Sequence, residues 1–245
     1  MGKNGFDNET QIKEEINEKI YPDLNTTFKR IIKESFSNYR DSRIICKKEG
    51  GPNKSDLLIE MNKSKKQIRL SIKKGSGNSV HQEPIEDFLK YLEEEFNISE
   101  NLKNDFRLFI WGDDTLNGKG EKKDRLSATD FKKKFPEVVK RLASFMHLHR
   151  KKFIERFVVL GPKSNQKPDY IYYGDFKKGY WSKSNDVIEY LSKSNSKSAI
   201  PVGKLTFQAW NRAIREDSKS EKKRGVIQLK WPTIKEDLIK LMKNE

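Results

Sequence analysis

The chain has 245 residues, enough for one sizeable domain, and carries 51 Lys and Arg against 36 Asp and Glu, for a net charge of +15. Hydrophobic residues make up only 34% of the chain, but 11% aromatic residues supply large side chains for a core, and the basic surplus favours a polyanionic partner such as nucleic acid. The lack of an apolar run of about 18 residues argues against a membrane span or a membrane partner, and the single cysteine, Cys46, excludes an internal disulfide and suits a reducing, cytoplasmic environment.

Hydrophobic periodicity and turn residues predict a mixed α/β (α+β) chain with a helical middle and a basic, aromatic, β-rich last third. The expected elements are, in chain order, a helix from Asp7 to about Ile20 that Pro22 ends, a helix from Asn25 or Thr26 to Phe36, strands at 43–47, 55–61 and 67–73, a helix from Pro84 to Phe96, helices at 128–135 and 136–153, strands at 157–160 and 170–173, a helix near 187–191, strands at 205–210 and 226–231, and an amphipathic tail through Ile234 and Leu241.

The segments 55–61 and 67–73 carry the most informative pair of residues, Asp56 and Lys73. A polar tip separates the two segments, which are expected to form a hairpin. Because strand side chains alternate between faces, Ser71 and Lys73 lie on the face opposite the apolar residues of their strand. With the apolar faces in the core, the hairpin brings one carboxylate, one hydroxyl and one ammonium group to the same place.

This combination suits the metal-assisted hydrolysis of a phosphodiester. Hard Mg²⁺ prefers carboxylate oxygens and water, polarises the phosphate and generates hydroxide. We expect Asp56 to be the main Mg²⁺ ligand and the carbonyl of Ile72 to be another. Lys73 is expected to position the attacking water or the phosphate.

Ser71 occupies the position where a second carboxylate is usual, and a hydroxyl adds no charge. Either Glu9, on the first helix, or Glu60 is therefore expected to complete the metal sphere, with Glu9 preferred. The alternative interpretation is structural, with Asp56 as a turn residue and Lys73 as a solvated strand residue.

A second acid-and-lysine pattern runs from Pro168-Asp169 to Asp175-Phe176-Lys177. Only five residues separate its two acids, which is too short for a hairpin that would place them side by side on neighbouring strands. We therefore predict that this segment is a strand that ends in a turn.

The layout of the whole chain adds to this interpretation. The relevant segments are Gly5-Phe6-Asp7-Asn8-Glu9, Ser55-Asp56, Ser71-Ile72-Lys73, the helix after the Gly-Ser loop, Gly203-Lys204-Leu205-Thr206-Phe207-Gln208 and Val226-Ile227-Gln228-Leu229-Lys230. In these features the chain resembles the small type II restriction endonucleases of the MspI kind and their GCGC-cutting relatives, within the PD-(D/E)xK nuclease superfamily. Those relatives carry an uncharged Gln or Asn at the position of Ser71. The resemblance implies a restriction-endonuclease-like core, with a central mixed sheet flanked by helices, and Mg²⁺-dependent cleavage of double-stranded DNA at a short specific sequence.

Polar and basic residues in two places are the expected DNA contacts. The first group is Lys74, Ser76, Asn78, His81 and Gln82, and the second is Gln208, Asn211, Arg212, Arg215, Lys222, Lys223 and Arg224. Arg can grip guanine, Gln or Asn can grip adenine, and lysines hold phosphates without reading sequence. The structural alternative places Phe207 and Trp210 in a core and leaves the charges on a solvated hairpin.

We therefore expect a single endonuclease domain over residues 1–245, with a catalytic core over about 1–100 and a β-rich DNA-recognition portion over about 155–245. The expected protein is a type II restriction endonuclease that works as a monomer or as a dimer assembled on DNA. The alternative is a noncatalytic or sequence-tolerant nucleic-acid-binding protein on a nuclease-like fold.

Overall fold

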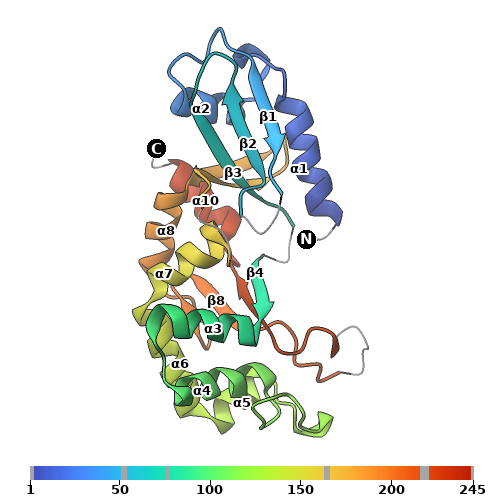
Figure 1. Cartoon of the computed structure of the whole chain (residues 1–245), viewed down its shortest axis with the longest axis vertical. Helices are drawn as coiled ribbons and strands as arrows, with labels where there is room; N and C mark the ends of the chain where they lie inside the picture. The colour runs from blue at the N-terminus through green and yellow to red at the C-terminus, as the bar shows by residue number, and fades with distance from the viewer. Residues whose placement is uncertain (1–2, 51–53, 76–77, 163–165, 216–220, 244–245) are drawn as a thin grey trace. The chain divides into compact units, whose positions relative to one another are not determined.

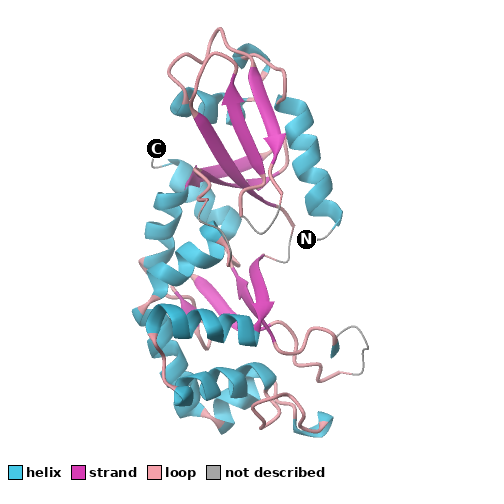
Figure 2. Ribbon diagram, viewed as in Figure 1, coloured by secondary structure: helices cyan, strands magenta, loops and turns pink. Residues whose placement is uncertain are grey.

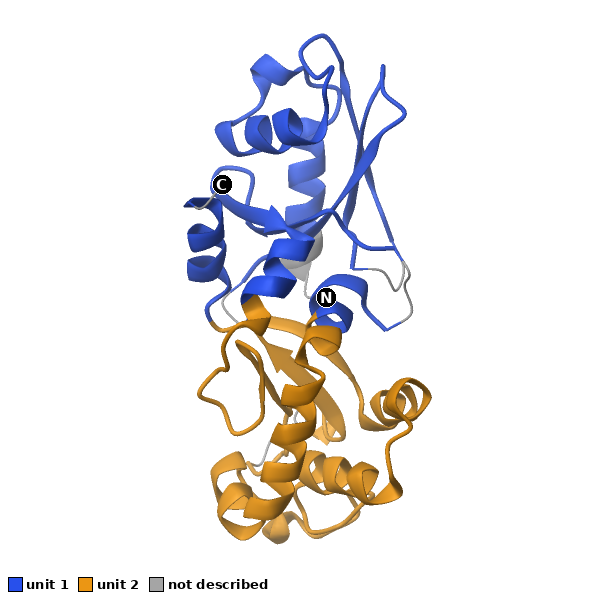
Figure 3. Ribbon diagram, turned by 90° about the vertical axis from the view of Figure 1, so that its left-hand side faces the viewer, with its two compact units in different colours: residues 1–78, 155–190, 233–245 blue, residues 79–154, 191–232 orange. Residues whose placement is uncertain are grey.

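The structure is a computed structural model that describes residues 3–50, 54–75, 78–162, 166–215 and 221–243. The chain divides into two compact units, shown in different colours in Figure 3. Unit 1 comprises residues 1–78, 155–190 and 233–245, and unit 2 comprises residues 79–154 and 191–232. Residues 155–190 thus belong with the first 78 residues, and the second unit begins at residue 79. The predicted catalytic core and DNA-recognition portion stay predictions.

Unit 1 contains a five-stranded mixed sheet in the order β1-β2-β3-β5-β6. Its elements are α1 (Lys3–Ile16), the 3-10 turn η1 (Tyr21–Asp23), α2 (Thr26–Ser35), β1 (Ile44–Lys48), β2 (Leu57–Met61), β3 (Gln67–Lys73), the π-helical segment η3 (Glu155–Leu160), β5 (Tyr170–Gly174), β6 (Gly179–Lys183), α8 (Ser184–Ser192), whose last two residues lie in unit 2, and α10 (Ile234–Lys243) (Figure 1). All neighbouring strands are antiparallel except β3 and β5, which run parallel. Parallel neighbours need a long crossover connection, and here residues 79–154 of unit 2 lie between them in the chain.

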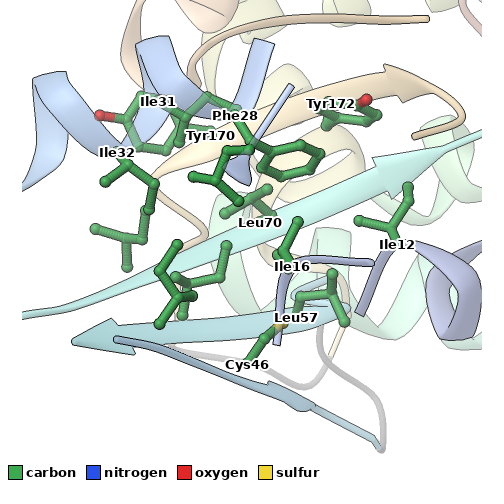
Figure 4. Close-up of a cluster of buried hydrophobic side chains, with 14 of the residues drawn as sticks. Ile12, Ile16, Phe28, Ile31, Ile32, Cys46, Leu57, Leu70, Tyr170 and Tyr172 are labelled. Atoms are coloured by element: carbon green, nitrogen blue, oxygen red, sulfur yellow. The ribbon is translucent and has the colours of Figure 1, made fainter. Parts of the chain in front are cut away.

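The core of unit 1 lies between the sheet and its helices. The apolar stripes of α1 and α2 supply Ile12, Ile16 and Phe28, which pack with strand residues such as Leu57 and Leu70 (Figure 4). All five are almost completely buried. The alternation of apolar residues along β2 and β3 therefore fixes which face of the hairpin turns toward the helices, and it leaves the other face for polar groups.

Unit 2 contains a four-stranded antiparallel sheet in the order β4-β9-β8-β7, drawn in magenta in Figure 2. Its elements are β4 (Ser79–Pro84), α3 (Ile85–Phe96), α4 (Glu100–Trp111), the 3-10 turn η2 (Lys122–Asp124), α5 (Ala128–Lys134), α6 (Pro136–Leu148), α7 (Arg150–Ile154), β7 (Pro201–Val202), β8 (Leu205–Ala209) and β9 (Val226–Lys230). Phe88 of α3, Phe106 of α4 and Phe207 of β8 meet with ring centroids 5.6–5.7 Å apart, so the helices cover one face of this sheet through aromatic contacts.

The predicted fold class is confirmed, since the protein is a mixed α+β structure with a central mixed sheet flanked by helices. The hairpin at 55–73 and the helix start at Asn25, whose side chain accepts a hydrogen bond from the N–H of Phe28, also form as expected. The strand expected at 157–160 is wrong, because these residues are π-helical and Phe157 to Val159 are fully buried. A continuous apolar run does not distinguish a buried strand from a buried helical turn. None of the helices in the described part of the chain is both long enough and apolar enough to cross a membrane.

Candidate active site

Asp56 lies directly before β2, at the end of the hairpin opposite its tip. Its backbone N–H donates to the carbonyl of Leu70 over 2.8 Å, and its Oδ2 accepts a hydrogen bond of 2.5 Å from the N–H of Ile72. The residue is only 3% exposed. These two hydrogen bonds to β3 fix the residue and its carboxylate beside the end of that strand. Asp56 is therefore not an ordinary turn residue.

Lys73, the last residue of β3, brings its ammonium group to the same place. Its Nζ lies 3.8 Å from Oδ2 of Asp56 and donates to Oγ of Ser71 over 2.7 Å. Ser71 is completely buried and Lys73 is about one sixth exposed at its side chain. The structure thus brings the three residues together as strand alternation predicted, with Ser71 bound to the lysine.

Glu9 comes to the edge of this group from α1. It is 6% exposed, and its Oε2 lies 3.2 Å from Nζ of Lys48. Burial raises the pKa of Glu9 most, and the negative charge of Asp56 raises it further, so the charges of the two carboxylates interact. The other proposed ligand, Glu60, lies elsewhere: it is four residues along β2 from Asp56, about 13 Å away, and it binds Lys47 and Gln67. Glu60 is therefore too far from Asp56 to share a metal ion with it, which corrects that alternative, and Glu9 stays the predicted ligand.

Burial raises the pKa of both carboxylic acids. For Asp56, desolvation is the largest cause, while the positive charge of Lys73 and the N–H of Ile72 act in the opposite direction. For Glu9, desolvation comes first and repulsion from Asp56 second, opposed by Lys48 and Lys73. Two buried carboxylates that repel each other are groups that a bound divalent cation would stabilise in their charged form.

The available donors fit Mg²⁺. They are two carboxylates, and Mg²⁺ sites commonly use one or two carboxylates and keep several waters. Because the N–H and C=O of a strand residue project toward the same neighbouring strand, the carbonyl of Ile72 lies on the Asp56 side of β3, where its N–H already bonds. Among the described residues there is no group of three or more His, Cys, Asp or Glu side chains with metal-binding geometry, so a third carboxylate does not join this site.

Two residues at this site were not found from the sequence. The strand expected at 43–47 stops before Lys48, which in fact ends β1. Lys48 lies on the same face as the buried Ile44 and Cys46, and this alternation along the strand could have placed its side chain toward α1. Asn8 is 2% exposed; its Nδ2 donates to the carbonyl of Gly174, and its Oδ1 accepts a hydrogen bond from Nζ of Lys74. Asn8 thereby ties the first helix to β5 and to the basic residue that follows Lys73.

The second acid-and-lysine pattern forms a strand that ends in a turn, as predicted. Asp169 accepts a hydrogen bond from the N–H of Arg69, before β5 begins. Asp175 lies in the turn between β5 and β6, where its Oδ1 accepts the N–H groups of Lys177 and Lys178. The two carboxylates therefore hold backbone groups at opposite ends of β5.

Three of the expected DNA contacts are corrected by their burial in unit 2. Arg212 is 6% exposed, stacks over Phe109 and Phe131 and donates to the carbonyl of Phe109; burial lowers its pKa to about 10. The side chain of Arg224 is 9% exposed and binds Asp113 over 2.6 Å. His81 is 4% exposed and lies 2.9 Å from Glu83. These side chains contact other groups inside unit 2.

The other expected DNA contacts stay predictions. Lys74, Gln82, Arg215 and Lys222 are exposed, whereas Asn78, Gln208, Asn211 and Lys223 are half-buried. Lys223 stacks over Trp210, and Asn211 accepts a hydrogen bond from the N–H of Ala213. Ser76 lies outside the described residues.

Comparisons with protein-family models and with curated proteins found no match. Among solved structures, the chain is similar to the restriction endonuclease MspI in a crystal structure with its cognate DNA. The TM-score is 0.48 at 20% sequence identity, and the alignment covers 76% of this chain and 70% of that one.

Proposed function

We propose that this protein is a Mg²⁺-dependent endonuclease that hydrolyses double-stranded DNA at a short specific sequence, as type II restriction endonucleases do. The observation that carries the proposal is the meeting of the buried Asp56 with Lys73 at the end of a hairpin, beside the carboxylate of Glu9. A net charge of +15 supplies the attraction to a polyanion. The two buried carboxylates lie together with the ammonium groups of Lys48 and Lys73, and a cluster of charged groups of this kind is typical of a functional site.

In this proposal Asp56 and Glu9 hold the metal ion and the carbonyl of Ile72 is a further ligand. A bound Mg²⁺ supplies a Lewis acid at the phosphate and lowers the pKa of a bound water. Lys73 stabilises the charge that develops on the phosphate or orients the attacking water, and Ser71 holds the Lys73 ammonium in place through their 2.7 Å hydrogen bond. If the protein cuts as the restriction endonucleases that its sequence resembles, the product would carry a 5′-phosphate. We propose further that the protein acts in the cytoplasm, as a monomer or as a dimer assembled on DNA.

The deciding experiment is a digest of unmethylated phage DNA by the purified protein, with Mg²⁺ in one series and EDTA in the other. Discrete Mg²⁺-dependent fragments are the expected result, and the sequence of their ends would give the recognition site. A smear would indicate a sequence-tolerant nuclease in place of a restriction-type enzyme.

One observation favours a second candidate, a noncatalytic DNA-binding protein. Ser71 occupies the place of a carboxylate and is completely buried, so it adds neither charge nor an open ligand position to the site. Intact DNA in every lane of the digest, with a gel shift still present, would support this candidate and contradict the nuclease.

Metal binding is expected to stabilise the fold independently of cleavage. A Mg²⁺ concentration of 10 to 100 times the dissociation constant adds about 1.4 to 2.7 kcal/mol to the free energy of unfolding. Thermal unfolding with Mg²⁺ and with EDTA measures this gain. The Glu9→Gln variant should lose most of it, because the amide carries no charge, and an equal shift in wild type and variant would contradict the role of Glu9.

A further inference from the structure

Three glutamines of unit 2 lie side by side across its sheet. Gln82 of β4 pairs with Gln228 of β9, and Gln228 pairs with Gln208 of β8. Directly opposed residues of antiparallel strands lie on the same face of a sheet. The three amides therefore form one row that runs across three adjacent strands, which we call the glutamine row.

The glutamine row lies on the face of the sheet opposite the aromatic core. The residues that alternate with it, Phe207 on β8 and Ile227 and Leu229 on β9, are at most 1% exposed and lie on the core face. Gln82 is exposed, Gln208 is half-buried, and Gln228 in the centre is 7% exposed between its two neighbours. The exposure thus falls toward the centre of the row, because the two outer glutamines cover the sides of Gln228.

The sheet is narrow at the level of this row. The fourth strand, β7, pairs only with Leu205 and Thr206, so at Gln208 the sheet has three strands. Two strand spacings measure about 10 Å, and the major groove of B-DNA is about 12 Å wide. The row of three amides on this face is therefore about as wide as the groove.

The charge of this face matches DNA. The next paired row consists of Ser79, Lys230 and Thr206, which contribute two hydroxyls and one ammonium group. Beyond Gln82 and Gln228, the next pair on this face is Pro84 and Val226. Among these described residues of β4, β8 and β9 the face carries a positive charge and no carboxylate, so it attracts a phosphate backbone.

Hydrogen bonds orient the row before any ligand arrives. Nε2 of Gln208 donates to Oε1 of Gln228 over 3.1 Å, and Nε2 of Gln82 donates to Oγ of Ser79 over 3.1 Å. The bond between the two glutamines uses the amide nitrogen of Gln208 and the amide oxygen of Gln228. The amide oxygen of Gln208 and the amide nitrogen of Gln228 therefore point away from it. Side chains that are already ordered lose less conformational entropy on binding.

We propose that the glutamine row reads base edges in the major groove of the DNA, and that the recognised sequence contains adenine opposite Gln82 and opposite Gln208, the two outer and more exposed members of the row. Gln makes a bidentate contact with N6 and N7 of adenine, which distinguishes A·T from the other pairs. Lys230, in the neighbouring row, holds the phosphate backbone and reads no sequence. This inference rests on the proposed function, because it assigns the specificity of a protein that binds double-stranded DNA.

The test is selection of bound duplexes from a random library in EDTA, which prevents cleavage, followed by affinity measurements. The selected wild-type site should contain A·T pairs. Gln82→Ala and Gln208→Ala should each weaken binding to that site by about 5- to 100-fold, with unchanged binding to unrelated duplex. Lys230→Ala should weaken binding to the selected site and to unrelated duplex by the same factor, and it should reduce the dependence of binding on salt. Gln82 is exposed, so its variant is informative even if Gln208→Ala unfolds.

Gln67→Ala is the matched control, since Gln67 is an exposed strand glutamine of unit 1 that binds Glu60. It should leave site preference unchanged. The inference would be overturned if the Gln82→Ala, Gln208→Ala double variant kept the wild-type preference, or if the selected site contained no A·T pairs. In either case, Mg²⁺-dependent cutting at discrete sites would still support the nuclease. Absence of any DNA binding by the wild type would overturn both.

Discussion

The Asp56→Asn variant is expected to lose DNA cleavage and to gain stability. Asn keeps an oxygen that can accept the N–H of Ile72, so the strand pairing at this position survives. It removes the charge that holds the metal ion, and several kcal/mol of transition-state stabilisation, about 10³-fold or more in rate, should be lost. In the metal-free protein, the same change removes a buried negative charge that repels Glu9.

The gain in stability should be on the order of 1 kcal/mol in EDTA, which is usual for relieving strain at a functional site. Cleavage rates in Mg²⁺ and thermal unfolding in EDTA measure the two effects. Asp175→Asn is the matched control, because Asp175 also binds backbone N–H groups but belongs to the turn before β6. That variant should cut at the wild-type rate. Full activity of Asp56→Asn would contradict the assignment of the metal site.

The raised pKa values also fix the sign of the pH dependence. A carboxylic acid whose pKa is higher in the folded protein than in the unfolded chain binds more protons when folded. Its contribution to stability is therefore present at low pH and is lost as the pH rises through the folded pKa. In EDTA, wild type should lose stability relative to Asp56→Asn as the pH rises above the ordinary range of carboxylic acids, and Mg²⁺ should reduce this loss.

The hairpin could be predicted because its information is local. Alternation along 55–61 and 67–73 fixes the buried face, and with it the common face of Ser71 and Lys73. The parallel pairing of β3 with β5 joins residues about one hundred positions apart, and no local pattern encodes it. For the same reason the sequence could not show that Asn8 reaches Gly174 or that residues 155–190 belong to unit 1.

The surface could be predicted less well than the core. The basic surplus was expected to face DNA in the last third of the chain, but the guanidinium of Arg212 lies between Phe109 and Phe131. Arginine stacks on aromatic rings and is weakly hydrated, so it is the cation best able to enter an aromatic core. The glutamine row gave no sequence signal, because its three members become neighbours only through strand pairing.

Lys73→Ala is expected to lower the cleavage rate by about 10²- to 10³-fold and to leave DNA affinity nearly unchanged. The lysine is one of 51 Lys and Arg residues, so its loss changes the attraction to DNA little, whereas it is the ammonium group nearest Asp56 at this site. Cleavage and gel-shift assays on the same preparation separate the two effects. Lys47→Ala is the matched control, because Lys47 is an exposed strand lysine that binds Glu60.

The pH profile distinguishes a catalytic Lys73 from a structural one. The positive charge of Lys73 lowers the pKa of Asp56 against the effect of burial. Without this charge the pKa of Asp56 rises further, so the ionised ligand forms only at higher pH and the acid limb of the residual activity should move upward. Lys73→Arg keeps the charge and should restore the position of that limb, even though its wider, planar group fits the bond to Ser71 less well. If Lys73→Ala cleaves more slowly but the acid limb of its pH profile does not move, Lys73 does not act on Asp56. Its role would then be limited to the phosphate.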